Sequence, residues 1–212
     1  MALPSEKLIT INDRGARTAT TFGSVEASDG SMTFIKKLTA SSSATLSFVD
    51  GASSVVLDNT YKEYLFTFNN LHPQNDTIQL MVNYSIDGGS NYNATKTSTF
   101  FLSRHQETGA SSELSYKTGQ DLAQSTSNQQ LTVDTDNDND SGISGYLQLF
   151  NPSDTTFVKH WISRVQSVQT NAHSMEHYTA GYVNSTSAVD AVQFTVSSGN
   201  IDAGDICLYG IL

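Results

Sequence analysis

The chain has 212 residues, a formal net charge of −10, 15% charged residues and 37% hydrophobic residues. Nucleic acid and anionic membrane surfaces repel such an acidic chain, so both are excluded as partners, and no apolar stretch is long enough to span a bilayer. The remainder is rich in Ser, Thr and Asn, which are poor helix-interior residues, and Thr is favourable in strands. Composition therefore predicts an all-β fold.

The first element in chain order is an extended N-terminal arm over residues 1–32. Turn signals recur at residues 12–17 and 27–31, and large apolar side chains are few. Such a segment buries too little to offset its own ordering entropy. It either orders against another subunit or protein, for attachment or assembly, or is a floppy terminus. Its start lacks the basic region and apolar run of a signal peptide, so we expect synthesis in a cytosol without export.

Residues 33–212 form the predicted β-sandwich domain, in which strand signals recur at sandwich-like spacing. Tyr64, Phe66 and Phe68 share one strand face, and apolar residues alternate from Ile78 to Ile86. Together with long, unequal loops, these signals predict an all-β, jelly-roll-like antiparallel β-sandwich. The predicted strands are residues 33–39, 44–49, 62–69, 77–86, 95–104, 143–150, 156–169, 174–183, 189–197 and 205–211.

Two stretches lack clear strand signals. Residues 105–130 are polar, and we expect a loop with a short helical turn around residues 121–124. Residues 134–142 form an acidic, Asn-rich loop, in which every second position is a carboxylate. These carboxylates are Asp134, Asp136, Asp138 and Asp140.

Four carboxylates in one loop have the hard oxygen ligands that Ca²⁺ prefers. The EF-hand pattern fails, however, because Asn139 stands where that pattern needs Gly and Gly145 stands where it needs Glu. We therefore expect the four Asp side chains to be solvated and to form no required metal site. A calcium site remains the alternative.

The sequence holds no motif for catalysis, so no catalytic, cofactor-binding or metal-binding residue is assigned and no enzyme is predicted. His173 and His177 lie about 13 Å apart on one strand face, too far to share a small metal ion directly. His160 beside Trp161 is expected at the strand surface next to the core. Cys207, the only cysteine, lacks a basic neighbour in sequence, so a buried thiol is predicted. The carboxylates available to a glycosidase cannot be paired from sequence; they are Glu63, Glu107, Glu113 and Glu176.

Aromatic residues give the best argument for ligand binding. Tyr92, Tyr116 and Tyr178 lie near predicted loops. Exposed rings there can stack on sugar faces while Asn, Asp and Ser side chains bond the hydroxyls; the alternative is that most of these rings pack in the core or between subunits.

Several segments resemble a β-sandwich domain of structural proteins of marine tailed bacteriophages. The resemblance spans about residues 45–212 and consists of strand and turn motifs. These are residues 61–66 (YKEYLF), 85–93 (SIDGGSNYN), 96–101 (KTSTFF), 145–152 (GYLQLFNP) and 157–160 (FVKH), with the closing turn at 198–201 (SGNI) and the last strand ending in YGI at 209–211.

This resemblance implies a non-enzymatic virion protein exposed on the particle surface, either a short tail fibre or appendage, or a capsid decoration protein. It implies synthesis in the bacterial host cytoplasm, and it carries over no catalytic residue. The expected partners are two further copies in a homotrimer, capsid or tail components bound through the arm, and a host surface glycan. A carbohydrate-binding receptor-recognition module is the alternative, and a glycan hydrolase or esterase has less support.

Overall fold

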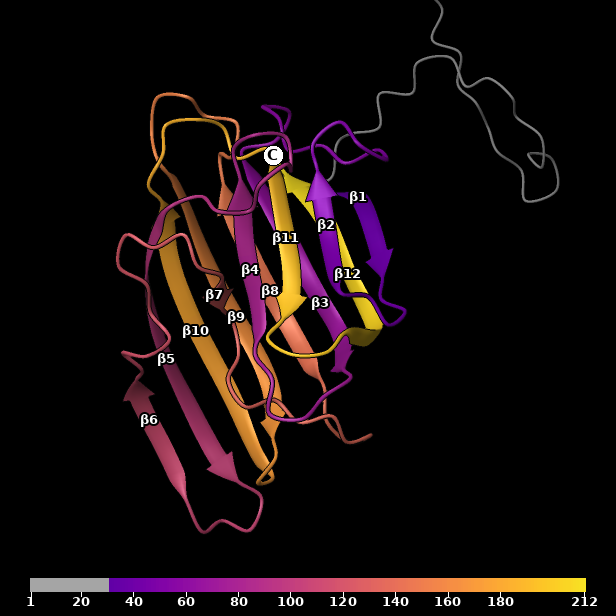
Figure 1. Cartoon of the computed structure of the whole chain (residues 1–212), viewed down its shortest axis with the longest axis vertical. Helices are drawn as coiled ribbons and strands as arrows, with labels where there is room; N and C mark the ends of the chain where they lie inside the picture. The colour runs from indigo at the N-terminus through magenta and orange to yellow at the C-terminus, as the bar shows by residue number, and fades with distance from the viewer. Residues whose placement is uncertain (1–30) are drawn as a thin grey trace, which may run out of the picture. The chain divides into compact units, whose positions relative to one another are not determined.

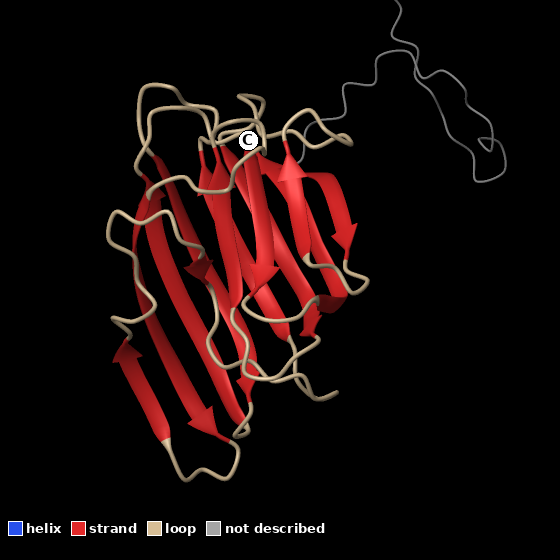
Figure 2. Ribbon diagram, viewed as in Figure 1, coloured by secondary structure: helices blue, strands red, loops and turns tan. Residues whose placement is uncertain are grey.

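The computed structural model describes residues 31–212, so the interpretation of residues 1–30 as an arm lies outside the described residues. The described part contains twelve strands in two sheets and no helix, hence no helix that could cross a membrane (Figure 2). Every strand pair is antiparallel. The prediction of an all-β antiparallel sandwich is confirmed.

The two sheets differ in size, and the smaller one packs on part of the larger (Figure 1). The large sheet contains, in spatial order, β1 (Met32–Thr39), β12 (Ile201–Ile211), β3 (Glu63–Pro73), β8 (Ile143–Phe150), β9 (Lys159–Gln169), β10 (His173–Val183), β5 (Lys96–Gln106) and β6 (Ser112–Tyr116). The small sheet contains β2 (Thr45–Val49), β11 (Ala191–Val196), β4 (Leu80–Ser85) and β7 (Gln129–Gln130).

The large sheet is extended by two hairpins, β9–β10 and β5–β6. Without them, β1-β12-β3-β8 would face β2-β11-β4-β7, and the first and last described strands would still be neighbours. This order is compatible with the predicted jelly-roll-like connectivity, which itself stays a prediction. The hairpins matter for function because they carry the large sheet beyond the small one.

The main core lies between the two sheets and is dominated by aromatic rings. Phe194 of β11 makes edge-to-face contacts with Phe48, Phe66 and Phe68, with ring centroids 6.3, 5.4 and 5.2 Å away. Such contacts follow from the alternation in the sequence, since Tyr64, Phe66 and Phe68 all point inward and are buried. Trp161 extends this core onto β9.

The inner side of the hairpin extension is covered mainly by irregular chain, in which the two residues of β7 are the strand. Residues 117–136 run over it and hydrogen-bond to its strands. The backbone N–H of Val133 donates to Nε2 of His177 at 3.3 Å, and that of Leu122 donates to Oγ of Ser98 at 2.9 Å. Val133 of this cover packs on Phe100, Leu102 and Met175 of the strands beneath it, and the four form a small apolar cluster.

Two lysines are buried at one end of the large sheet. Lys96 and Lys159 both pair with Val183, one from each side. Lys96 Nζ donates to the carbonyl of Ala94 at 3.0 Å, and burial lowers its pKa to about 8. Lys159 Nζ donates to two backbone carbonyls, at 3.0 and 3.1 Å. Both ammonium groups are therefore held by backbone oxygen atoms inside the protein.

The sequence prediction was wrong in part for residues 105–130. All ten predicted strands exist, but this stretch also contains β6 and the short β7, and the turn at residues 121–124 is not helical. The backbone N–H groups of Leu122 and Gln124 bond to the side chains of Ser98 and Thr97 on β5 instead of to a helical turn. These backbone groups therefore bond to a strand that is distant in sequence, and not to one another within the helical turn that the polar sequence suggested.

Candidate functional site

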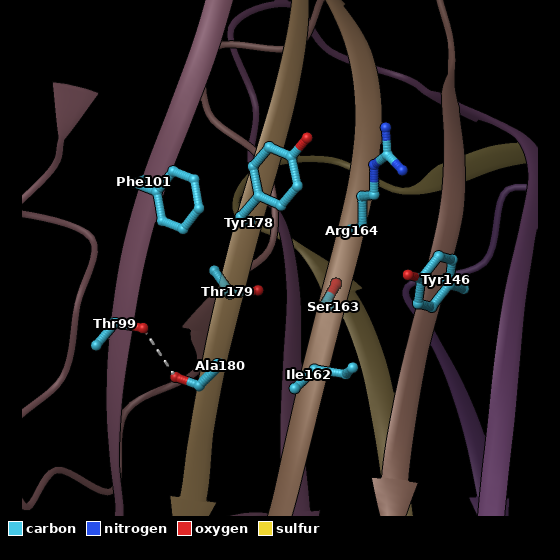
Figure 3. Close-up of a pocket in the computed structure, with 9 residues that line it drawn as sticks. All are labelled: Thr99, Phe101, Tyr146, Ile162, Ser163, Arg164, Tyr178, Thr179 and Ala180. Carbon is cyan, nitrogen blue, oxygen red and sulfur yellow. Dashed lines mark hydrogen bonds between the residues drawn. The ribbon is translucent and has the colours of Figure 1, made fainter. Parts of the chain in front are cut away.

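The most prominent surface feature is the outer face of the large sheet, defined as the face turned away from the small sheet. Strand register places one row of large side chains across four strands of this face. We call it the aromatic row, and it consists of Phe101, Tyr178, Arg164 and Tyr146 (Figure 3). Directly paired residues point to the same side of a sheet, so these four project together.

The aromatic row is held rigidly by stacking and by an ion pair. The rings of Phe101 and Tyr178 are parallel, with centroids 4.7 Å apart and 6° between their planes. The guanidinium of Arg164 lies 5.6 Å from the centre of the Tyr178 ring and is ion-paired with Glu176. The ring of Tyr178 is thus packed between an aromatic ring and a cation, and both interact favourably with its π-electrons.

The neighbouring row has smaller side chains, and a trough results. Thr99, Ala180 and Ile162 line both a hollow of about 380 Å³ beside the aromatic row and a second of about 360 Å³ toward Tyr182 and His160. The side chain of Thr99 is short, and its hydroxyl reaches only the backbone of the neighbouring strand, where it donates to the Ala180 carbonyl at 3.4 Å (Figure 3). Short side chains between tall rings therefore make a trough across β5, β10 and β9.

The row that forms the floor of the trough continues toward the far edge of the sheet. It crosses seven strands, with Phe34, Tyr209, Leu65, Gln148, Ile162, Ala180 and Thr99 in register. Phe101 is 40% exposed, Ile162 is 41% exposed and Phe34 is 57% exposed. Phe34 and Ile162 are in this row and Phe101 is in the adjacent aromatic row, and several exposed large apolar side chains on one face are typical of a contact surface.

The charges on this face are few and fixed. The hydrogen bond from Tyr178 to Glu176 raises the pKa of the phenol, and burial adds to this effect. The bond to Arg164 lowers the pKa of Glu176. At neutral pH the face therefore has a neutral phenol, one carboxylate and one guanidinium over β5, β10, β9 and β8.

The three tyrosines singled out for sugar stacking do not come together. Tyr178 lies in the aromatic row, where both of its ring faces are covered. Tyr116 lies beside this row on β6, pairs with Phe101 and donates its hydroxyl to Asp121 at 2.5 Å. Tyr92 is elsewhere, half-buried beyond β4 next to Gly89. Sequence reasoning missed Phe101, Ile162 and Tyr146, because only the strand register aligns them.

The expectation that all four loop aspartates are solvated is wrong for Asp136. Asp138 and Asp140 are exposed, but Asp136 is only 7% exposed and its carboxylate accepts the backbone N–H of Asn137 at 2.7 Å. Burial, and next the carboxylate of Asp76, raise the pKa of Asp136. The loop folds inward here because Thr135 bridges to both Ile78 and Gln169. Within residues 31–212, no three His, Cys, Asp or Glu side chains are grouped to hold a metal ion.

The histidines and the cysteine lie as their sequence context suggests. His160 is exposed beside buried Trp161, and Cys207 is a buried free thiol. His177 is buried, donates from Nδ1 to the Val165 carbonyl at 3.1 Å, and has its pKa lowered by burial to about 4. Ser111 Oγ lies 2.9 Å from Nε2 of His173, but Nδ1 of that ring has no partner among the described residues. A serine hydrolase would need an acid there.

Comparison of the chain with protein-family models, with curated proteins and with solved structures finds no match.

Proposed function

We propose that this chain is a non-enzymatic structural protein of a bacteriophage particle, exposed at the particle surface as a short tail fibre or appendage or as a capsid decoration protein. We further propose that it assembles into a homotrimer through the outer face of the large sheet. The resemblance of residues 45–212 to phage structural domains supports the first part. The observation that supports the second is the set of exposed large apolar side chains on this face, Phe34, Phe101 and Ile162.

The size of this face suits a stable contact between subunits. Neighbouring strands lie about 4.8 Å apart, so a row over seven strands is about 30 Å long. Several such rows side by side reach the area of about 800 Å² per partner that specific interfaces bury. Tyr, Phe and Arg, which make up the aromatic row, are also among the residues enriched in interfaces.

The charge of the face favours a second copy of this chain as the occupant. The chain carries a net charge of −10, so most approaches between two copies are repulsive. On β5, β10, β9 and β8 the outer face carries only the Arg164–Glu176 pair, in which the charges cancel, whereas β3 adds the carboxylate of Glu63. The four strands β5, β10, β9 and β8 are therefore the favoured centre of the contact. Two copies can approach there without the repulsion that acts elsewhere.

The test is the molar mass of the full chain in solution, measured by light scattering. We expect about three times the chain mass of 22.9 kDa for the wild type. Ile162→Asp buries an unpaired charge in the contact and should shift the mass toward that of one chain. Phe157→Asp is the matched control, because Phe157 is 70% exposed but lies in the loop before β9, and it should leave the mass unchanged.

A wild type that stays at 22.9 kDa at every concentration tested would overturn the assembly proposal. A map of the intact particle would test the virion proposal separately. Its copy number per particle distinguishes a decoration protein, which covers the shell, from a tail appendage. The carbohydrate-binding module remains a second candidate, which the polar hollow described next favours.

A further inference from the structure

A third hollow lies on the inner side of the hairpin extension, where the small sheet ends. Its volume is about 260 Å³. β5 and β10 contribute most of its floor, and the walls come from the segment between β6 and β8, which includes β7, from Gln79 before β4 and from Gln169 at the end of β9. This hollow is separate from the trough, because it opens on the opposite face of the same strands.

The floor of this hollow is apolar and firmly packed. Leu102, Met175 and Val133 line it, and all three belong to the small apolar cluster. A ligand in the hollow would therefore lie with one side on aliphatic groups and a thioether. Such a surface suits the C–H groups of a small ring.

The walls contain buried polar atoms without partners. Gln169 is 8% exposed, and its Oε1 has no hydrogen-bond partner although its Nε2 donates to Asp134 at 3.3 Å. Oε1 of Gln130 and Nε of Arg104 are also buried and unpartnered. A buried polar group left without a partner costs about 1–3 kcal/mol. All three belong to residues that line the hollow, so small side-chain movements would let a polar ligand supply the missing partners.

The charges of the hollow cancel, which restricts the ligand class. Glu113 accepts from Arg104 at 2.7 Å and from Lys117 at 2.7 Å, so its carboxylate is shared by both cations. Asp134 supplies the second negative charge at the rim. A phosphate or a divalent cation would thus find no net opposite charge here. The amides of Gln79, Gln120, Gln130 and Gln169 offer donors and acceptors together, as hydroxyl groups require.

We propose that this hollow binds one neutral monosaccharide unit, at the end of a glycan chain. Its volume is below the range of about 300–1,000 Å³ typical of sites for drug-sized ligands, so a single sugar ring is the appropriate size. The sugar hydroxyls bond the glutamine amides and Arg104, and its apolar face lies on Leu102 and Met175. The site does not depend on assembly through the outer face.

Met175 in the floor provides a direct test in the full-length protein. The chain has four methionines, so methyl-labelled methionine gives a simple NMR spectrum even for a trimer. We expect the Met175 methyl signal, identified with Met175→Leu, to shift saturably with at least one of glucose, galactose, mannose and N-acetylglucosamine. Met32 lies on β1 at the opposite edge of the large sheet, and its signal should not move.

Gln169→Leu tests the polar wall, since it keeps the approximate size of the side chain and removes its amide. It should weaken sugar affinity about tenfold or more, as expected for loss of a buried hydrogen bond worth about 1.5 kcal/mol. Gln166→Leu is the matched control, because Gln166 is on the outer side of the same strand. Thermal melts verify that both variants fold, and Gln130→Leu replaces Gln169→Leu if the latter does not.

Absence of a saturable shift with all four sugars would overturn the proposal. So would Gln169→Leu binding as tightly as the wild type, or a shift with inorganic phosphate alone, which would indicate an anion site. The light-scattering experiment does not involve the hollow, so failure of one proposal can be distinguished from failure of the other.

Discussion

The inner face of the large sheet has two regions, and they are covered in different ways. Under the small sheet, Phe66 and Phe68 meet Phe194 in an apolar core. Under residues 117–136, the inward residues of β5 and β10 include buried Ser98 and His177, which accept the backbone N–H groups of Leu122 and Val133. An irregular segment has backbone N–H and C=O groups that no ladder pairs, so the strands beneath it need polar side chains to satisfy them. The kind of chain that covers each region of the inner face therefore determines whether its buried side chains are apolar or polar.

The largest expected effect concerns the packing of the two regions. Phe194→Ala should lower the free energy of unfolding by about 3–5 kcal/mol, because three neighbouring rings then face a cavity. Phe100→Ala, in the second region, should cost less, because an irregular cover can collapse into the space. Urea denaturation of both variants measures the difference. Equal losses would mean that the two covers are equally rigid.

The next effect concerns His177, whose pKa is lowered from the usual 6.5 to about 4. Because the folded-state pKa is below the unfolded one, the unfolded state takes up the proton first as the pH falls. Stability should therefore decrease between pH 6.5 and pH 4, by about 3 kcal/mol in total. Unfolding free energies measured across this range test the prediction.

His177→Gln should remove most of this decrease. A glutamine can donate to the Val165 carbonyl and accept from the Val133 N–H, as the imidazole does, but does not titrate. His105→Gln is the control, since His105 is exposed on β5, and it should retain the decrease. If both variants lose stability with pH as the wild type does, another group is responsible for the acid sensitivity.

The smallest effect concerns the end of the irregular cover at Asp136, whose pKa is raised by burial and by Asp76. The raised pKa means that the ionised carboxylate destabilises the fold at neutral pH, and that this cost disappears as the pH falls through the folded-state pKa. Asp136→Asn should thus stabilise the protein at pH 7 by about 1 kcal/mol, the size typical of single substitutions, and by less in acid. Asp140→Asn, at an exposed position, should have no effect.

Thermal melts with millimolar Ca²⁺ and with chelator complete this test. We expect the two wild-type midpoints to agree. If Ca²⁺ instead raises the midpoint by several degrees and Asp136→Asn destabilises the protein, then Asp76 and Asp136 share a cation.

The two regions also differ in how well the sequence predicts them. The strands of the aromatic core were predictable, because Tyr64, Phe66 and Phe68 alternate on a half-buried surface. β6 was not, because Ser112–Tyr116 is polar, short and stabilised by its pairing with β5. Strand propensity depends on neighbours of this kind more than on the residues themselves.

The candidate sites were less predictable than the fold. Tyr178 was one of three candidates for sugar stacking, but its stacking on Phe101 depends on register between strands more than 70 residues apart in sequence. The sequence Phe100-Phe101 contains no signal for which ring is buried. The hollow on the inner side of the hairpin extension combines Gln79, Gln130 and Gln169, which are individually unremarkable polar residues. Only the sheet topology brings their amides together.

The buried lysines have a practical consequence for measuring how this protein opens. Acylating reagents modify a lysine amine only when it is both accessible and uncharged. Lys96 and Lys159 are enclosed in the native state, whereas Lys37 is exposed. Peptide analysis gives the acylation rates of the two buried amines relative to that of Lys37. These relative rates report how often this end of the sheet opens locally. Peptide mass spectrometry can follow this acylation in the unmodified sequence, with no residue introduced as a probe.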